Sequence, residues 1–65
     1  MTNPATPYRL DNAVIAQAHA RDAALNARNA LIIGDHANAL RWQREAAYWA
    51  GEVRYYLTAV IYDLP

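Results

Sequence analysis

Two stripes of small and aromatic residues run through this chain at helical spacing and mirror each other about the dipeptide Gly34-Asp35. Residues that recur every three or four positions lie on one face of an α-helix. The first stripe is Ala13, Ala16, Ala20, Ala23, Ala27 and Ala30, and the second is Ala39, Trp42, Ala46, Trp49, Val53, Tyr56 and Val60. When the chain folds back at the dipeptide, each facing pair has numbers that sum to 69, as in Ala27 with Trp42. We therefore predict an all-α fold, a long antiparallel hairpin of two helices.

Local signals place the ends of the two predicted helices. Glycine adopts the left-handed conformation that ends helices, and aspartate is a good N-cap, so Gly34-Asp35 forms the turn. We expect an N-terminal tail over 1–8 and a single domain over 9–65, with helices at about 9–33 and 36–63. Thr6 and Asp11 are rival N-caps for the first helix. No segment has the alternating pattern of a strand.

The predicted hairpin core consists of one small or aromatic stripe on each helix. Its members are Ala13, Ala16, Ala20, Ala23, Ala27, Ala30, Trp42, Ala46, Trp49, Val53 and Tyr56. The apolar arc of the second helix spans about 160°, which is wider than one antiparallel neighbour covers.

Seven large apolar residues remain outside this core. They are Leu25, Leu31, Ile32, Leu40, Leu57, Ile61 and Leu64. Burial of each is worth about 1.5–3 kcal/mol. Leaving them all exposed would forfeit roughly 10 kcal/mol, comparable to the stability of a small domain. We therefore expect the hairpins to self-associate, most simply as a dimeric four-helix bundle with twofold symmetry.

A column of tyrosines lies on the face of the second helix that points away from the first. Tyr48, Tyr55 and Tyr62 recur every seven residues, and Arg44 stands one turn before Tyr48, where it is placed to stack on the ring. Because tyrosine is enriched at interface hot spots, the column predicts a contact surface. Two interpretations stay open: the column serves self-association, or it binds a foreign partner.

Composition excludes several kinds of chemistry. The chain has 65 residues, no cysteine, two glycines and a net charge of zero. It also contains no serine. Disulfides, thiolate metal sites, serine nucleophiles and glycine-rich phosphate loops are therefore excluded. Six arginines are balanced by six acids, which leaves no long-range field to recruit nucleic acid.

The titratable residues form no recognisable catalytic or metal-binding pattern. His19 and His36 lie on different predicted helices, so we expect surface or capping roles for both. Glu45 and Glu52 are one heptad apart and are interpreted as a solvated face, partly paired with Arg41 and Arg44. We expect no catalytic, cofactor-binding or metal-ligating residue and no cofactor.

The middle of the chain resembles a tetratricopeptide repeat over roughly 20 residues. The residues that carry the resemblance are Ala27, Gly34-Asp35-His36, Ala39-Leu40 and Ala46. The early Trp or Leu positions of the repeat fall on Ala23 and Asn26, its late proline is missing, and the second helix is about twice as long as a repeat helix. We do not assign the chain to this family.

These patterns predict a non-enzymatic assembly or adaptor module. It would oligomerise, most simply as a homodimer, and present its apolar, tyrosine-rich face to itself or to a larger protein, for example as a small component of a phage or bacterial complex. The alternative is a small dimeric nucleic-acid-binding accessory protein that forms an arginine surface on dimerisation. No signal peptide is visible, and the longest strongly apolar run, Tyr55 to Tyr62, is far short of the about 20 residues of a spanning helix. We expect a soluble, cytoplasmic protein without a membrane partner.

Overall fold

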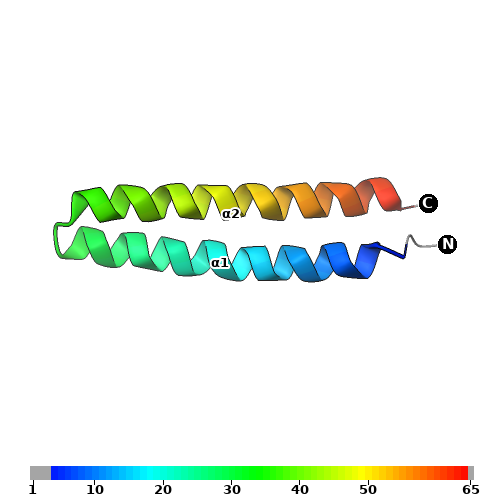
Figure 1. The fold of residues 1–65 in the computed structure, drawn as a ribbon, viewed down its shortest axis with the longest axis horizontal. Coiled ribbons are helices and arrows are strands. Elements are labelled where there is room, and N and C mark those ends of the chain that lie inside the picture. Colours follow the sequence, from blue (N-terminus) through cyan, green and yellow to red (C-terminus); the bar gives the residue numbers. More distant parts are fainter. Residues whose placement is uncertain (1–3, 65) are drawn as a thin grey trace.

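The computed structural model describes residues 4–64 and shows an antiparallel hairpin of two long helices (Figure 1). Helix α1 spans Thr6–Ile32, and helix α2 spans His36–Asp63. The Cα atoms fill a rod of 52 × 13 × 10 Å, and the start of α1 and the end of α2 lie side by side at the end opposite the turn. The predicted all-α hairpin is confirmed.

The turn has the structure that its two central residues predict. Gly34 adopts a left-handed conformation with φ of 78°, and its amide donates to the carbonyl oxygen of Leu31 at 3.1 Å. The amide of Asp35 donates to the carbonyl oxygen of Ala30 at 2.8 Å, which satisfies another carbonyl at the end of α1. The Asp35 carboxylate accepts a hydrogen bond from the Asn38 amide at 3.2 Å and therefore caps α2.

The first turn of α1 differs from the prediction, because neither Thr6 nor Asp11 is its N-cap. The cap is Ala5, which provides no side-chain hydrogen bond, and its carbonyl oxygen accepts from the Arg9 amide at 3.1 Å. Proline is tolerated here because it lacks an N–H that would have no partner within the first turn, and Pro7 occupies this turn. The Thr6 hydroxyl is directed instead to Asp63 on α2, at 3.5 Å from its carboxylate oxygen.

The contact between Thr6 and Asp63 also reports the register of the hairpin, since their numbers have the predicted sum of 69. The buried apolar residues of the described chain are Ala13, Ala16, Ala23, Ala30 and Ala39. The other members of the predicted core are half-buried: Ala20, Ala27, Trp42, Ala46, Trp49, Val53 and Tyr56. No large side chain of residues 4–64 is fully buried. The hairpin thus has a thin core of alanines flanked by partly exposed aromatic rings.

Candidate interaction surfaces

A long apolar groove runs along one side of the hairpin between α1 and α2. It consists of two hollows of about 400 Å³ each, which share Ala24 and Ala46 in their linings. The floor is formed by Ala20, Ala24, Ala27, Ala46 and Ala50, with Val53 toward one end and Leu31 and Leu40 toward the other. Both hollows are open to solvent and are not enclosed cavities. Protein side chains can therefore enter this alanine groove.

The ionisable residues that line the alanine groove are arginine and histidine, and the two arginines carry its positive charge. Arg21 and Arg28 come from α1, and His36 comes from the start of α2. No carboxylate of residues 4–64 is among the lining side chains. Arg21 and Arg28 are exposed and form no ion pair with any described residue. The groove is therefore apolar along its floor and positively charged at its rim.

The large apolar residues that the sequence places outside the core are exposed in the structure. Leu31 and Leu40 line the alanine groove. The exposed set that was predicted as an interface is Leu25, Leu31, Ile32, Leu40, Leu57, Ile61, Leu64, Tyr48, Tyr55 and Tyr62, and their exposed fractions range from 43% to 84%. The predicted interface did not include five further exposed large residues: Tyr8, Leu10, Val14, Ile15 and Ile33. None of these residues belongs to the alanine stripe of the first predicted helix.

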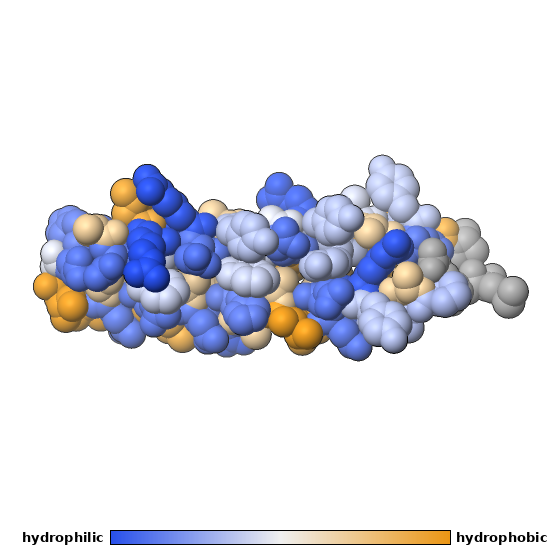
Figure 2. Space-filling model, in the orientation of Figure 1, coloured by the Kyte–Doolittle hydropathy of each residue, from blue (hydrophilic) through white to orange (hydrophobic). Residues whose placement is uncertain are grey.

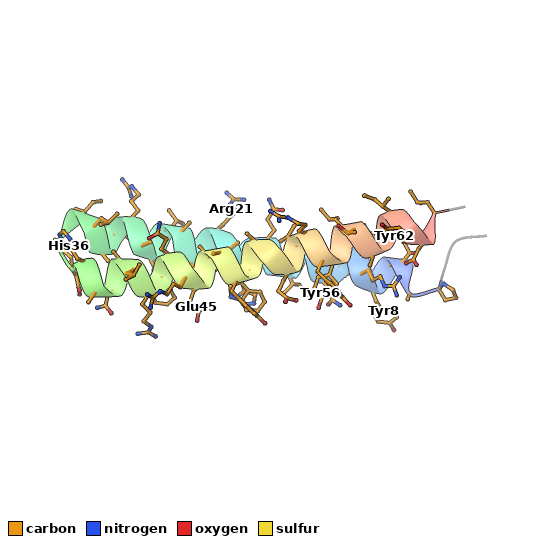
Figure 3. The ribbon with its side chains drawn as sticks, turned by 90° about the horizontal axis from the view of Figure 1, so that it is seen from above. Tyr8, Arg21, His36, Glu45, Tyr56 and Tyr62 are labelled. Atoms are coloured by element: carbon orange, nitrogen blue, oxygen red, sulfur yellow. The ribbon has the colours of Figure 1, made fainter. Side chains whose placement is uncertain are left out.

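A second surface follows the outer face and one edge of α2. Glu45, Tyr48, Glu52, Tyr55 and Tyr62 recur at spacings of three, four and seven residues, and we call them the Glu/Tyr stripe. The three tyrosines are exposed, with Tyr62 at 84%. In Figure 3, Glu45 projects from the side of the hairpin opposite Arg21. That side faces the viewer in Figure 2, where blue and pale colours predominate and orange is sparse.

Both tryptophans contact other side chains of the same chain. His19 stacks on Trp49 with ring centroids 4.4 Å apart, and Tyr48 meets the same indole edge-on at 5.1 Å. The guanidinium of Arg41 lies 5.3 Å from the ring centroid of Trp42. The cation–π contact of the described chain is thus made by Arg41, and not by Arg44 on Tyr48 as the spacing suggested. His19 is exposed, yet its ring joins α1 to α2.

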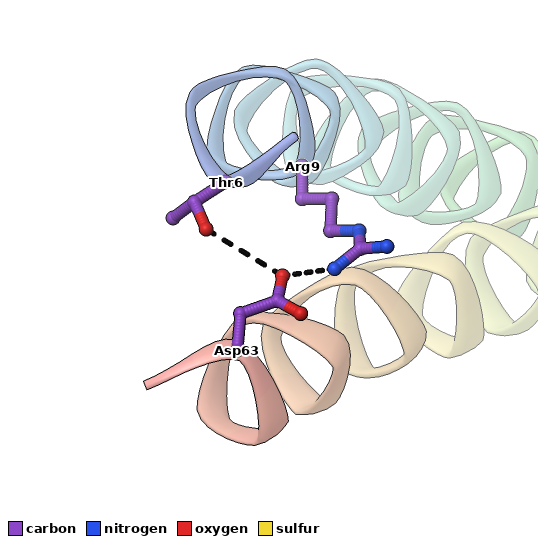
Figure 4. Close-up of polar contacts among 3 residues, drawn as sticks. All are labelled: Thr6, Arg9 and Asp63. Atoms are coloured by element: carbon purple, nitrogen blue, oxygen red, sulfur yellow. Dashed lines mark hydrogen bonds and ion pairs between the residues drawn. The ribbon is translucent and has the colours of Figure 1, made fainter. Parts of the chain in front are cut away.

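A polar clamp joins the free ends of the two helices (Figure 4). Arg9 forms an ion pair with the Asp63 carboxylate, and the Thr6 hydroxyl donates to the same oxygen. The Asp63 side chain is only 12% exposed, whereas that of Arg9 is 33% exposed. Sequence reasoning missed this clamp, although the sum of 69 for facing residues extends to Thr6 and Asp63.

The remaining titratable residues do not converge on a reaction centre. Residues 4–64 contain no group of three His, Cys, Asp or Glu side chains that could hold a metal ion. Glu45 and Glu52 form no ion pair with Arg41 or Arg44, contrary to the prediction, and so stay available on the surface. Along the described chain, no helical stretch is both apolar and long enough to cross a bilayer. In comparisons with known families, curated proteins and solved structures, the chain matched none of them.

Proposed function

We propose that this chain is a non-enzymatic assembly module that self-associates through its exposed apolar surface and presents the rest of that surface to a larger protein. The observation that carries the proposal is the content of the core, since the buried apolar residues of the described chain are five alanines. Chains of this size bury only about 60% of their unfolded surface and are marginally stable alone. A second copy supplies the large apolar contacts that one hairpin lacks.

The accessible surface supports this proposal quantitatively. The hairpin exposes 5075 Å². A compact monomer of the same mass exposes roughly 4200 Å², so the excess is about 900 Å². A standard protein interface removes about 800 Å² from each partner. The excess surface of one hairpin is therefore as large as one stable interface requires.

The chemistry of the alanine groove supports association with protein. Its floor is apolar, and leucines stand at one end. Removing apolar surface from water is worth about 25 cal/mol per Å², which favours a helix or another hairpin as the occupant. Half-buried aromatic rings add contact area on the other side of the hairpin, where Tyr56 lies opposite Arg21 (Figure 3), and aromatic residues are enriched at hot spots.

Sedimentation equilibrium at micromolar concentration tests the proposal. We expect a mass of at least two chains for the wild type, and a shift toward one chain for Leu40→Asp, which places a charge in the groove. Ile15→Asp is the matched control, because Ile15 is also exposed but does not line the groove. A wild-type chain that is folded by circular dichroism and sediments as a monomer would contradict the proposal.

A further inference from the structure

We propose that the contact between copies is heterologous: the Glu/Tyr stripe of one hairpin occupies the alanine groove of the next. The inference rests on the proposed self-association and specifies its geometry and its occupant. It also gives the tyrosine column a role in self-association. From the sequence alone, the column serves either self-association or a foreign partner.

The groove and the stripe have complementary charges. The rim of the groove carries Arg21 and Arg28, and no described carboxylate lines it. A symmetric groove-to-groove contact would place four arginines in one interface without an acid, and like charges brought together in an interface are unfavourable. Glu45 and Glu52 carry the opposite charge on another part of the surface, and neither has an ion-pair partner among the described residues. Arg41 and Arg44 stand beside Glu45, but the Arg41 guanidinium lies over the Trp42 ring. The groove and the stripe of a second copy therefore complement each other, whereas two grooves do not.

The arginines of the groove and the glutamates of the stripe have the same spacing. Arg21 and Arg28 are seven residues apart on α1, and Glu45 and Glu52 are seven residues apart on α2. Seven residues correspond to about 10.5 Å along a helix and return nearly to the same face. Two ion pairs can thus form at once when α2 of one copy lies along α1 of the next. The rigidity of both helices fixes these distances.

The small side chains of the groove also suit the large side chains of the stripe. The groove floor is made of alanines, which leave room for large side chains, and the tyrosines of the stripe are exposed. Small residues already face large ones within the hairpin, since the alanines of α1 face the tryptophans of α2. Tyr48 and Tyr55 flank Glu52 along the stripe, so their rings would enter the groove where the ion pairs form at its rim. Tyrosine combines apolar area with a hydroxyl that stays hydrated at an interface edge.

The geometry has a consequence for the size of the assembly. A contact between two different surfaces leaves one groove and one stripe free at the ends of every open oligomer. Such contacts produce a ring if the rotation closes, and an open filament if it does not. A dimer with twofold symmetry, by contrast, uses the same surface on both copies and ends at two chains.

Charge reversal tests the proposal, with sedimentation velocity as the readout and circular dichroism as the check on folding. We expect Arg21→Glu/Arg28→Glu and Glu45→Arg/Glu52→Arg each to raise the dissociation constant about tenfold or more, equivalent to about 1.4 kcal/mol. An equimolar mixture of the two variants should assemble again, because each contact then joins opposite charges. Recovery on mixing cannot come from two misfolded chains.

Three outcomes would overturn the proposal. If Glu45→Arg/Glu52→Arg assembles as the wild type does, the stripe is not in the interface, and a symmetric dimer or a foreign occupant of the groove is left. If both variants are impaired and the mixture does not recover, the two surfaces do not meet. If the wild type is itself monomeric, the proposed function fails together with this inference, so the wild-type measurement separates the two.

Discussion

Replacing Ala16 by leucine tests how tightly the two helices pack. Ala16 is 1% exposed and lies level with Val53 in the register that the contact of Thr6 with Asp63 reports. Leucine replaces the methyl group by an isobutyl group at a site without free space, and such overpacking costs about 1–3 kcal/mol. The free energy of unfolding of a chain this size is roughly 3–10 kcal/mol, so the loss is a large part of the total. Ala18→Leu is the matched control, since Ala18 is exposed on the same helix and should change stability by less than about 0.5 kcal/mol.

Glycine at the same two positions separates burial from helix propensity. Ala16→Gly removes a buried methyl group, worth about 0.8 kcal/mol, and lowers helix propensity by about 1 kcal/mol. Ala18→Gly lowers propensity alone, so the difference between the two variants measures the burial. Urea unfolding followed by circular dichroism at one fixed chain concentration is the assay, because self-association adds stability by mass action. If Ala16→Leu is as stable as Ala18→Leu, the hairpin core is not closely packed at this position, which would refute the expectation.

Other perturbations address the ends of the helices. Arg9→Met and Asp63→Asn should each lower the free energy of unfolding by about 1–2 kcal/mol, and a double-mutant cycle should give a coupling near 1 kcal/mol that weakens with salt; zero coupling would show that the clamp is not stabilising. Gly34→Ala should cost about 1–2 kcal/mol through its positive φ alone, since nothing lies within 4 Å of the added Cβ atom. Gly51→Ala, in equally open space within α2, should instead stabilise by about 1 kcal/mol, and denaturant midpoints that move in the same direction for both would refute this. Asp35→Ala should cost about 1 kcal/mol through loss of the N-cap, and thermal melts that match the wild type would argue against the cap.

The hairpin and its register can be predicted from the residues alone. Gly34 and Asp35 are read locally, because a left-handed residue and a side-chain cap need only the neighbouring backbone. The spacing of the alanine and aromatic stripes determines which face of each helix is turned inward, since helical geometry is fixed at 3.6 residues per turn. A tight turn then leaves little freedom in which residues face each other.

The polar and aromatic contacts across the two helices, by contrast, follow from how the folded helices approach each other. Thr6 has the identity of an N-cap, but its hydroxyl reaches Asp63 because the free ends of the helices lie side by side. His19 belongs to the polar face of α1 by sequence, yet its ring covers Trp49. Such contacts depend on rotamers and on the approach of two helix edges, which helical periodicity does not encode. The mirrored stripes about Gly34-Asp35 therefore predicted the hairpin core. The basic rim of the alanine groove could not be predicted from them, because the groove is formed by residues of both helices in the folded structure.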